Sequence, residues 1–280
     1  MTRLIMTTSD SGAGCLREAG LADIVIPFGL RLVWGPVPSA TEFAKLFAPP
    51  SANEGVPSWL KKFSQARKGL ARKSLGLLEL CHDCEAIELW IDPEPNAQLQ
   101  LIRLLDYFRS DANIASKLTL RQTELRIDEQ AFDAVAEWRP AAVKIEGDHF
   151  EVASRAWQAY THPTPETWFN LLTSDLSALP RLAQAALELL EELPAKQTGI
   201  GATEMRMLEL ISAGNVNPCD VFPGDRKPNN RGVFEYWEVG HLLDGLANGP
   251  TPAISGLDEG PFTIAMHEDV TVTGAIAAVS

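Results

Sequence analysis

The sequence lacks any apolar run that approaches the roughly 20 residues a membrane-spanning helix needs. It begins with a single basic residue, Arg3, and a four-residue apolar run, which is too short for the core of a secretory signal. We therefore expect a cytoplasmic protein with no membrane partner. The 280 residues, 45% hydrophobic and 22% charged, are enough to bury a sizeable core in one large domain or two smaller ones.

Positive charge and cysteine are both scarce. There are 24 Lys and Arg against 37 Asp and Glu, so the formal net charge is −13. The average field of such a surface repels nucleic-acid duplexes and anionic membranes. The four cysteines, Cys15, Cys81, Cys84 and Cys219, are unevenly spaced. They fit reduced thiols better than a disulfide framework.

Motifs for catalysis or metal binding are largely missing. The sequence has neither a Ser-His-Asp order nor an H-E-x-x-H motif, and its five scattered histidines are expected to be structural. Cys81-His82-Asp83-Cys84 is a C-x-x-C pair, but structural zinc needs a second pair of ligands that is absent. The pair follows a predicted helix, where the helix dipole disfavours a reactive thiolate. The sequence therefore predicts two semi-buried thiols in a turn, no metal and no cofactor.

What the sequence does contain is an alternation of strand and helix patterns over residues 1–127. Strands are predicted at 3–7, 24–26, 86–91 and 117–120, and helices at 14–19, 59–80 and through Leu101, Leu104, Leu105 and Phe108. This alternation predicts an α/β N-terminal domain with a small, mostly parallel sheet covered by helices.

The pattern becomes mostly helical after residue 127. Helices are predicted at 129–138, 149–161 and 179–190, which indicates a helical region over 128–198. Residues 199–280 then show helices at 203–213 and 233–246 with a short helical turn at 218–222 between them. Strands at 254, 262–266 and 270–273 follow, so this order predicts a winged-helix-like C-terminal domain.

The composition of this predicted C-terminal domain disfavours direct DNA binding. A recognition helix needs basic or amide side chains for bases and phosphates. The helix at 233–246 offers Glu235, Glu238 and Asp244 and no Lys or Arg. An interaction or packing module that contacts a protein is the better interpretation.

The turn from residue 9 to residue 14 is the first candidate site. It leads from the first predicted strand into a helix, so its backbone N–H groups and small polar side chains could bind an anionic or polar group. The dinucleotide fingerprint fails because Arg17 occupies the position of the third glycine, and a Gly-Lys-Ser/Thr phosphate loop is absent. The competing interpretation is a tight strand-to-helix turn with Asp10 or Ser11 as the N-cap.

A second candidate follows the predicted strand at 86–91. Asp92, Glu94, Asn96 and Gln98 lie at its carboxyl end, where α/β folds gather ligand-binding groups. A carboxylate there could act as a base or bind a hydroxyl group. Alternatively, these side chains cap the next helix.

A basic segment is the third feature. Six Lys and Arg lie between Lys61 and Lys73 without an acidic residue among them. Such a segment could face a phosphate or carboxylate, although the solvated face of an amphipathic helix is the favoured interpretation.

Three segments resemble a bacterial family, domain-of-unknown-function family 1835. The sequence Ser9-Asp10-Ser11-Gly12-Ala13-Gly14-Cys15-Leu16-Arg17-Glu18-Ala19 is similar to its opening signature, a Gly-Asp-Ser-small-small-Gly turn followed by a Leu-basic-Glu-Ala helix. Two later segments are also similar to the family: Trp34-Gly35-Pro36-Val37-Pro38, and Glu88-Leu89-Trp90-Ile91-Asp92 followed by Gln98-Leu99-Gln100-Leu101. The C-terminal segment is similar to the small helical domain that is often attached to members of the family. This chain departs from the pattern at Ser9 and at Phe28-Gly29. The resemblance implies no particular reaction.

The expected function is binding of a small polar or anionic ligand at the first strand-to-helix turn, with or without turnover. The predicted ligand-binding residues are Ser9, Asp10, Ser11, Gly12, Gly14, Asp92 and Gln98. The alternative is a regulatory or interaction protein that contacts a protein or nucleic acid through its C-terminal domain.

Overall fold

The computed structural model describes residues 2–49, 76–130, 132–215, 217–221, 232–248, 250–257 and 277–278. The chain divides into two compact units, residues 1–186 and 187–280, whereas the sequence predicts divisions after residues 127 and 198. Within the described residues, none of the helices is both long and apolar enough to cross a bilayer.

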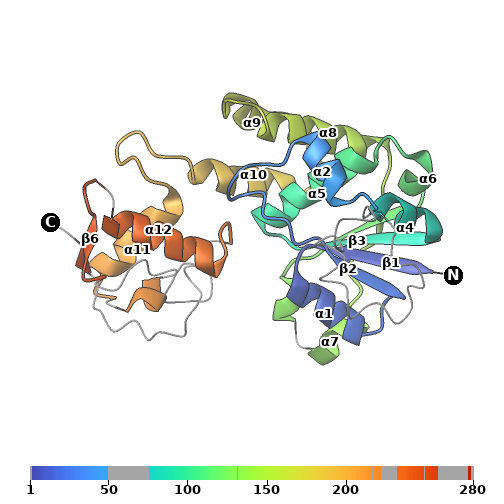
Figure 1. Cartoon of the computed structure of the whole chain (residues 1–280), viewed down its shortest axis with the longest axis horizontal. Coiled ribbons are helices and arrows are strands. Elements are labelled where there is room, and N and C mark those ends of the chain that lie inside the picture. The colour runs from blue at the N-terminus through green and yellow to red at the C-terminus, as the bar shows by residue number, and fades with distance from the viewer. Residues whose placement is uncertain are drawn as a thin grey trace. The chain divides into compact units, whose positions relative to one another are not determined.

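The described part of the first unit is built on a five-stranded sheet with the order β2-β1-β3-β4-β5 (Figure 1). Its strands are β1 (Arg3–Thr7), β2 (Ile24–Pro27), β3 (Ala86–Ile91), β4 (Leu118–Gln122) and β5 (Val143–Lys144). β1 pairs in parallel with β2 and with β3, β3 pairs in parallel with β4, and the short β5 is antiparallel to β4. The predicted α/β architecture with a mostly parallel sheet is confirmed.

Helices cover both faces of this sheet. They are α1 (Asp10–Glu18), α2 (Ala40–Leu46), α4 (Leu77–Asp83), α5 (Pro95–Phe108), α6 (Ala112–Ala115), α7 (Phe132–Glu137), α8 (Gly147–Tyr160) and α9 (Glu166–Leu171), with a 3-10 turn η2 (Ile127–Glu129). Figure 1 shows α1 and α7 on one face and α5 on the other, with α8 packed on the outer side of α5. α10 (Leu182–Glu191) spans the boundary between the two units.

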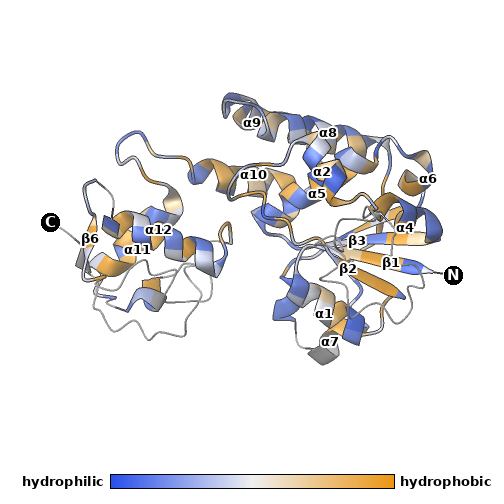
Figure 2. Cartoon of the chain, viewed as in Figure 1, coloured by the Kyte–Doolittle hydropathy of each residue, from blue (hydrophilic) through white to orange (hydrophobic). Residues whose placement is uncertain are grey.

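The central strands β1 and β3 and the neighbouring β2 are largely apolar, as expected for strands whose two faces are both covered. Leu4, Ile5 and Met6 of β1 are all fully buried. On the side of α1, Ile5 packs in one cluster with Leu16 and Trp90. α5 lies between the sheet and α8 and is buried along almost its whole length, which explains the apolar residues around it in Figure 2. The result is a rigid base under the loops that leave the strands.

The first helix begins four residues before its predicted start at Gly14. Ser9 is the N-cap, in place of the predicted Asp10 or Ser11, and its Oγ accepts a hydrogen bond from the Gly12 N–H at 3.0 Å. That hydrogen bond satisfies one of the N–H groups that a helix start leaves open, so the helix can begin at Asp10. Gly12 and Gly14 therefore lie inside α1 and not in a turn.

The second unit has its own core. Its elements are α11 (Ala202–Ser212), η3 (Pro218–Val221), α12 (Tyr236–Asn248), β6 (Ile254–Ser255) and β7 (Ala277–Ala278). Buried residues of the two helices, among them Met207, Ile211 and Leu243, pack together with Val221 and Ile254. β6 and β7 pair antiparallel. The predicted strands at 262–266 and 270–273 lie outside the described residues, as does the first part of the predicted helix at 59–80.

Candidate functional site

The strand order creates a switch point between β1 and β3. From β1 the chain passes through α1 to β2 on one side, and β3 then lies on the other side of β1. The two connections diverge at the carboxyl ends of β1 and β3, and open α/β sheets bind ligands at such a point. The residues that directly follow β1, β3 and β4 are Thr8, Asp92 and Thr123.

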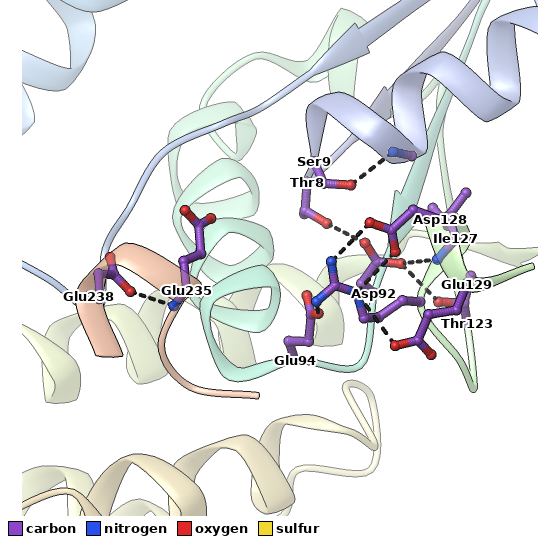
Figure 3. Close-up of polar contacts among 12 residues, drawn as sticks. Thr8, Ser9, Asp92, Glu94, Thr123, Ile127, Asp128, Glu129, Glu235 and Glu238 are labelled. Atoms are coloured by element: carbon purple, nitrogen blue, oxygen red, sulfur yellow. Dashed lines mark hydrogen bonds and ion pairs between the residues drawn. The ribbon is translucent and has the colours of Figure 1, made fainter. Parts of the chain in front are cut away.

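The side chains of Thr8 and Thr123 both lie against the Asp92 carboxylate (Figure 3). The Thr8 hydroxyl donates to Oδ2 at 3.2 Å, and the Thr123 hydroxyl lies 3.5 Å from Oδ1. The backbone N–H of Ile127 donates to Oδ1 at 2.9 Å. Asp92 is 2% exposed, and its burial raises its pKa to about 6, although the hydrogen bonds from Ile127 and Thr8 oppose the shift.

Glu94 lies two residues further along, at the start of α5. It occupies the N-cap position, but its side chain makes no capping hydrogen bond. Burial raises the pKa of Glu94 to about 7, the nearby Asp92 and Asp128 carboxylates add to the rise, and Arg126 opposes it. An acid with a pKa near neutrality can both release and accept a proton at physiological pH.

Arg126 links the acids of this edge. Its guanidinium binds both carboxylate oxygens of Asp128 at 2.9 Å, Glu94 at 2.8 Å and Glu129 at 3.8 Å. Because this arginine is surrounded by carboxylates, its pKa is raised. The Arg126 side chain is 44% exposed, so its ion pairs lie at the surface of the first unit. We call Thr8, Ser9, Asp92, Glu94, Thr123, Arg126, Asp128 and Glu129 the carboxyl-edge site.

Only part of the predicted opening turn belongs to the carboxyl-edge site. Ser9 belongs to the carboxyl-edge site, and Asp10 and Ser11 are exposed in the first turn of α1. Gly12 is buried, and its N–H is already bonded to Ser9 Oγ, so that N–H is not open to a ligand. A Cβ at Gly12 would come within 2.8 Å of Ser9 Oγ and 3.3 Å of Ile127 Cβ, which gives the glycine a packing role. Gly14 has open space around it.

Gln98 supports the site from below. It is fully buried in α5, where its amide nitrogen donates to the Asp92 backbone oxygen at 2.8 Å and its amide oxygen accepts from Gln122 at 2.9 Å. Asn96 similarly holds the loop at Leu30 and Leu32. Neither amide caps α5, and the Asp92 carboxylate bonds to other elements, so the capping interpretation does not describe this segment. Both ends of the Gln98 amide are bonded within the protein, and one of them holds the Asp92 backbone.

Sequence reasoning missed Thr8, Thr123, Arg126 and Asp128. Thr8 carried a usable signal, because it directly follows the strand predicted at 3–7, whereas Thr123 directly follows β4 only because that strand runs two residues beyond the predicted 117–120. The sequence carries no signal for Arg126 and Asp128, because their approach to Glu94 depends on the path of the loop after β4. The sequence also did not predict the two-residue strand β5, which is too short to show a periodic pattern.

The other chemical candidates contribute little to this site. Cys81 and Cys84 are both buried, and burial raises the pKa of each thiol, to about 11 for Cys84, which disfavours a reactive thiolate. The basic segment between Lys61 and Lys73 lies outside the described residues. In the part of the chain that the structure describes, no group of three or more His, Cys, Asp or Glu side chains is arranged to hold a metal ion.

No protein-family model matches the chain, and no curated protein matches it either. Its resemblance to domain-of-unknown-function family 1835 therefore stays a prediction.

Proposed function

We propose that the first unit binds a small, uncharged polar ligand at the carboxyl-edge site, where the partly exposed Glu94 exchanges a proton with a hydroxyl or amide group of the ligand and the buried Asp92 lies behind it. The observation that carries this proposal is the position of Glu94. It is a carboxyl with a pKa of about 7, beside a second carboxyl with a pKa of about 6, at the switch point of a parallel sheet. Titratable groups with raised pKa values are concentrated at functional sites.

The charge balance favours a neutral ligand over the anion that the opening turn suggested. Four carboxyl groups, those of Asp92, Glu94, Asp128 and Glu129, lie around the guanidinium of Arg126, and Arg31 adds a second positive charge that acts on Glu94. The Arg126 guanidinium already donates two hydrogen bonds to Asp128 and forms ion pairs with Glu94 and Glu129, so it has little capacity left for a phosphate.

Binding of paired neutral and phosphorylated compounds tests the proposal. We would titrate the full chain with glycerol, ribose and adenosine and with their monophosphates, and follow binding by ligand-observed NMR. At least one neutral compound is expected to bind, and Glu94→Gln is expected to weaken it about tenfold, or about 1.4 kcal/mol. Glu124→Gln is the matched control, because Glu124 is an exposed acid in the same loop as Arg126.

Two outcomes would count against a neutral ligand. In one, the monophosphates bind more tightly than their parents and Glu94→Gln leaves that binding unchanged. In the other, none of the neutral compounds binds while the variant and control fold normally.

We further propose that the second unit is a winged-helix-like module that contacts a protein. The order α11, η3, α12 and then the antiparallel pair β6–β7 supports the first part. Two aromatic side chains at the start of α12 support the second, since Tyr236 is 47% exposed and Trp237 36%. Exposed aromatic residues are common anchors in protein interfaces. We expect no retention of a mixed-sequence DNA duplex by the full chain in a gel-shift assay at low salt; retention that weakens as salt rises would contradict the proposal.

A further inference from the structure

A second concave site lies in the first unit, away from Asp92 and Glu94. A cavity of about 660 Å³ opens between β4, β5, the first half of α8 and the segment 175–181. Leu120 and Val143 form apolar parts of its wall, and Glu146 and charged side chains from α8 and from 175–181 form a polar part. This volume lies in the range of pockets that bind small molecules.

His149 is a buried polar group in the wall of this cavity. The residue is 9% exposed, and its Nδ1 accepts a hydrogen bond from the Glu146 backbone N–H at 3.2 Å. Because Nδ1 is the acceptor, the proton of the neutral ring lies on Nε2. Among the described residues Nε2 has no hydrogen-bond partner. The cavity wall therefore holds a fixed donor that the protein itself leaves unused.

Two arginines add charge to this donor. Arg155 bonds only to the backbone oxygen of Asp175, at 3.0 Å, and the Arg181 guanidinium has no partner among the described residues. An arginine in a groove usually pairs with the nearest carboxylate. Here neither arginine forms an ion pair with any acid that the structure describes.

Carboxylates line the same cavity without neutralising the arginines. Asp175 accepts a hydrogen bond from the Ser177 N–H at 2.9 Å, while Asp148 and Glu151 are exposed on the first turns of α8 and form no ion pair in the described part of the chain. Arg155 attracts the Asp175 carboxylate, but Arg181, Asp148 and Glu151 face the same cavity without an ion pair in the described part of the chain. A molecule that carries both charges would satisfy both groups at once, whereas a simple anion would meet the acids and a simple cation the arginines.

We propose that this cavity binds a zwitterionic amino acid. Its carboxylate would lie against the Arg181 guanidinium and the Nε2–H of His149, and its ammonium group would lie towards Asp148 and Glu151. The apolar wall at Leu120 and Val143 would accommodate an aliphatic part of the molecule. This site shares no charged residue with the carboxyl-edge site, so the two proposals stand independently.

Calorimetric titration of the full chain tests this site with complete and half ligands. The complete probes are glycine, L-glutamine and 6-aminohexanoate, and the half ligands are acetate and methylammonium. At least one amino acid is expected to bind, with both half ligands at least about tenfold weaker. Arg181→Gln should reduce that affinity at least about tenfold, whereas Arg139→Gln should leave it unchanged. Arg139 is the matched control because its guanidinium donates to backbone oxygens of Ala136 and Trp138 and does not line the cavity.

Fold integrity and site identity are checked in the same experiment. Arg181→Gln must give the same far-UV circular dichroism spectrum and melting temperature as the parent. Asp148→Asn, which changes an exposed residue, provides a second test of the same cavity. Glu94→Gln should leave amino-acid binding unchanged, which separates this site from the carboxyl-edge site. The proposal is overturned if no amino acid in the series binds, if acetate binds as tightly as the amino acids, or if Arg181→Gln has no effect.

Discussion

Replacing Asp92 by alanine is expected to lower the free energy of unfolding by about 2 kcal/mol at pH 5. The Asp92 carboxyl is the acceptor for the Ile127 N–H and the Thr8 hydroxyl, and all three groups are buried. Alanine would leave the Ile127 N–H without a partner in a site that water cannot reach, and it would leave a small cavity. Urea unfolding followed by tryptophan fluorescence measures the change.

The effect of Asp92→Ala should shrink as the pH rises. Above its raised pKa of about 6 the buried carboxyl is ionised, and the cost of burying that charge offsets the hydrogen bonds. Asp92→Asn keeps an acceptor oxygen for Ile127 but carries no charge, so at pH 8 it should be at least as stable as the parent. Glu124→Ala, in an exposed position, should change stability by less than about 0.5 kcal/mol. If Asn were as destabilising as Ala at pH 8, burial of the Asp92 charge would not be the dominant cost.

Glu94 should make the protein less stable as the pH rises from about 4.5 to about 7. The pKa of an ordinary glutamate is 4.5, and burial raises that of Glu94 to about 7 in the folded chain. Between these values the folded chain holds a proton that the unfolded chain has released, so raising the pH favours unfolding. Allowing for the 22% exposure of the side chain, we expect this group to contribute about 2 kcal/mol across the window.

The difference between the parent and Glu94→Gln isolates this contribution, because other titrating groups are common to both proteins. The unfolding free energies of the parent and of Glu94→Gln, measured at pH 5, 6, 7 and 8, should be most similar at pH 5. The glutamine variant should be the more stable of the two at pH 8. Glu124→Gln should follow the parent at every pH. A difference that stays constant from pH 5 to pH 8 would show that the Glu94 pKa is not raised.

The sheet was predictable because its strands carry local signals. Residues 3–7 and 86–91 are short apolar runs bounded by polar turns, and the structure places β1 and β3 at those positions. Helices α8 and α11 also lie within one or two residues of their predicted bounds, since their apolar positions recur with helical spacing. The start of α1 was placed too late, because Gly12 and Gly14 are typical of a turn and the Ser9 cap was not recognised.

The candidate site was predictable only in part. Asp92 could be found because a polar residue at the end of a buried strand tends to face a ligand in α/β folds. The raised pKa of Glu94 could not, because it depends on burial under the loop after β4 and on Asp92 and Asp128. The sequence places Asp128 36 residues after Asp92 and gives no indication that one arginine, Arg126, connects the two segments. Such contacts are set by tertiary packing.

The most direct test of the carboxyl-edge site is a carbon-13 NMR titration of the side-chain carboxyl groups in the full chain. A glutamate resonance with a pKa of about 7 is expected, and it should be missing from Glu94→Gln and unchanged in Glu124→Gln. If instead every glutamate carboxyl titrates near the ordinary value of about 4.3, Glu94 is an ordinary surface acid and the proposed proton exchange at this site is wrong.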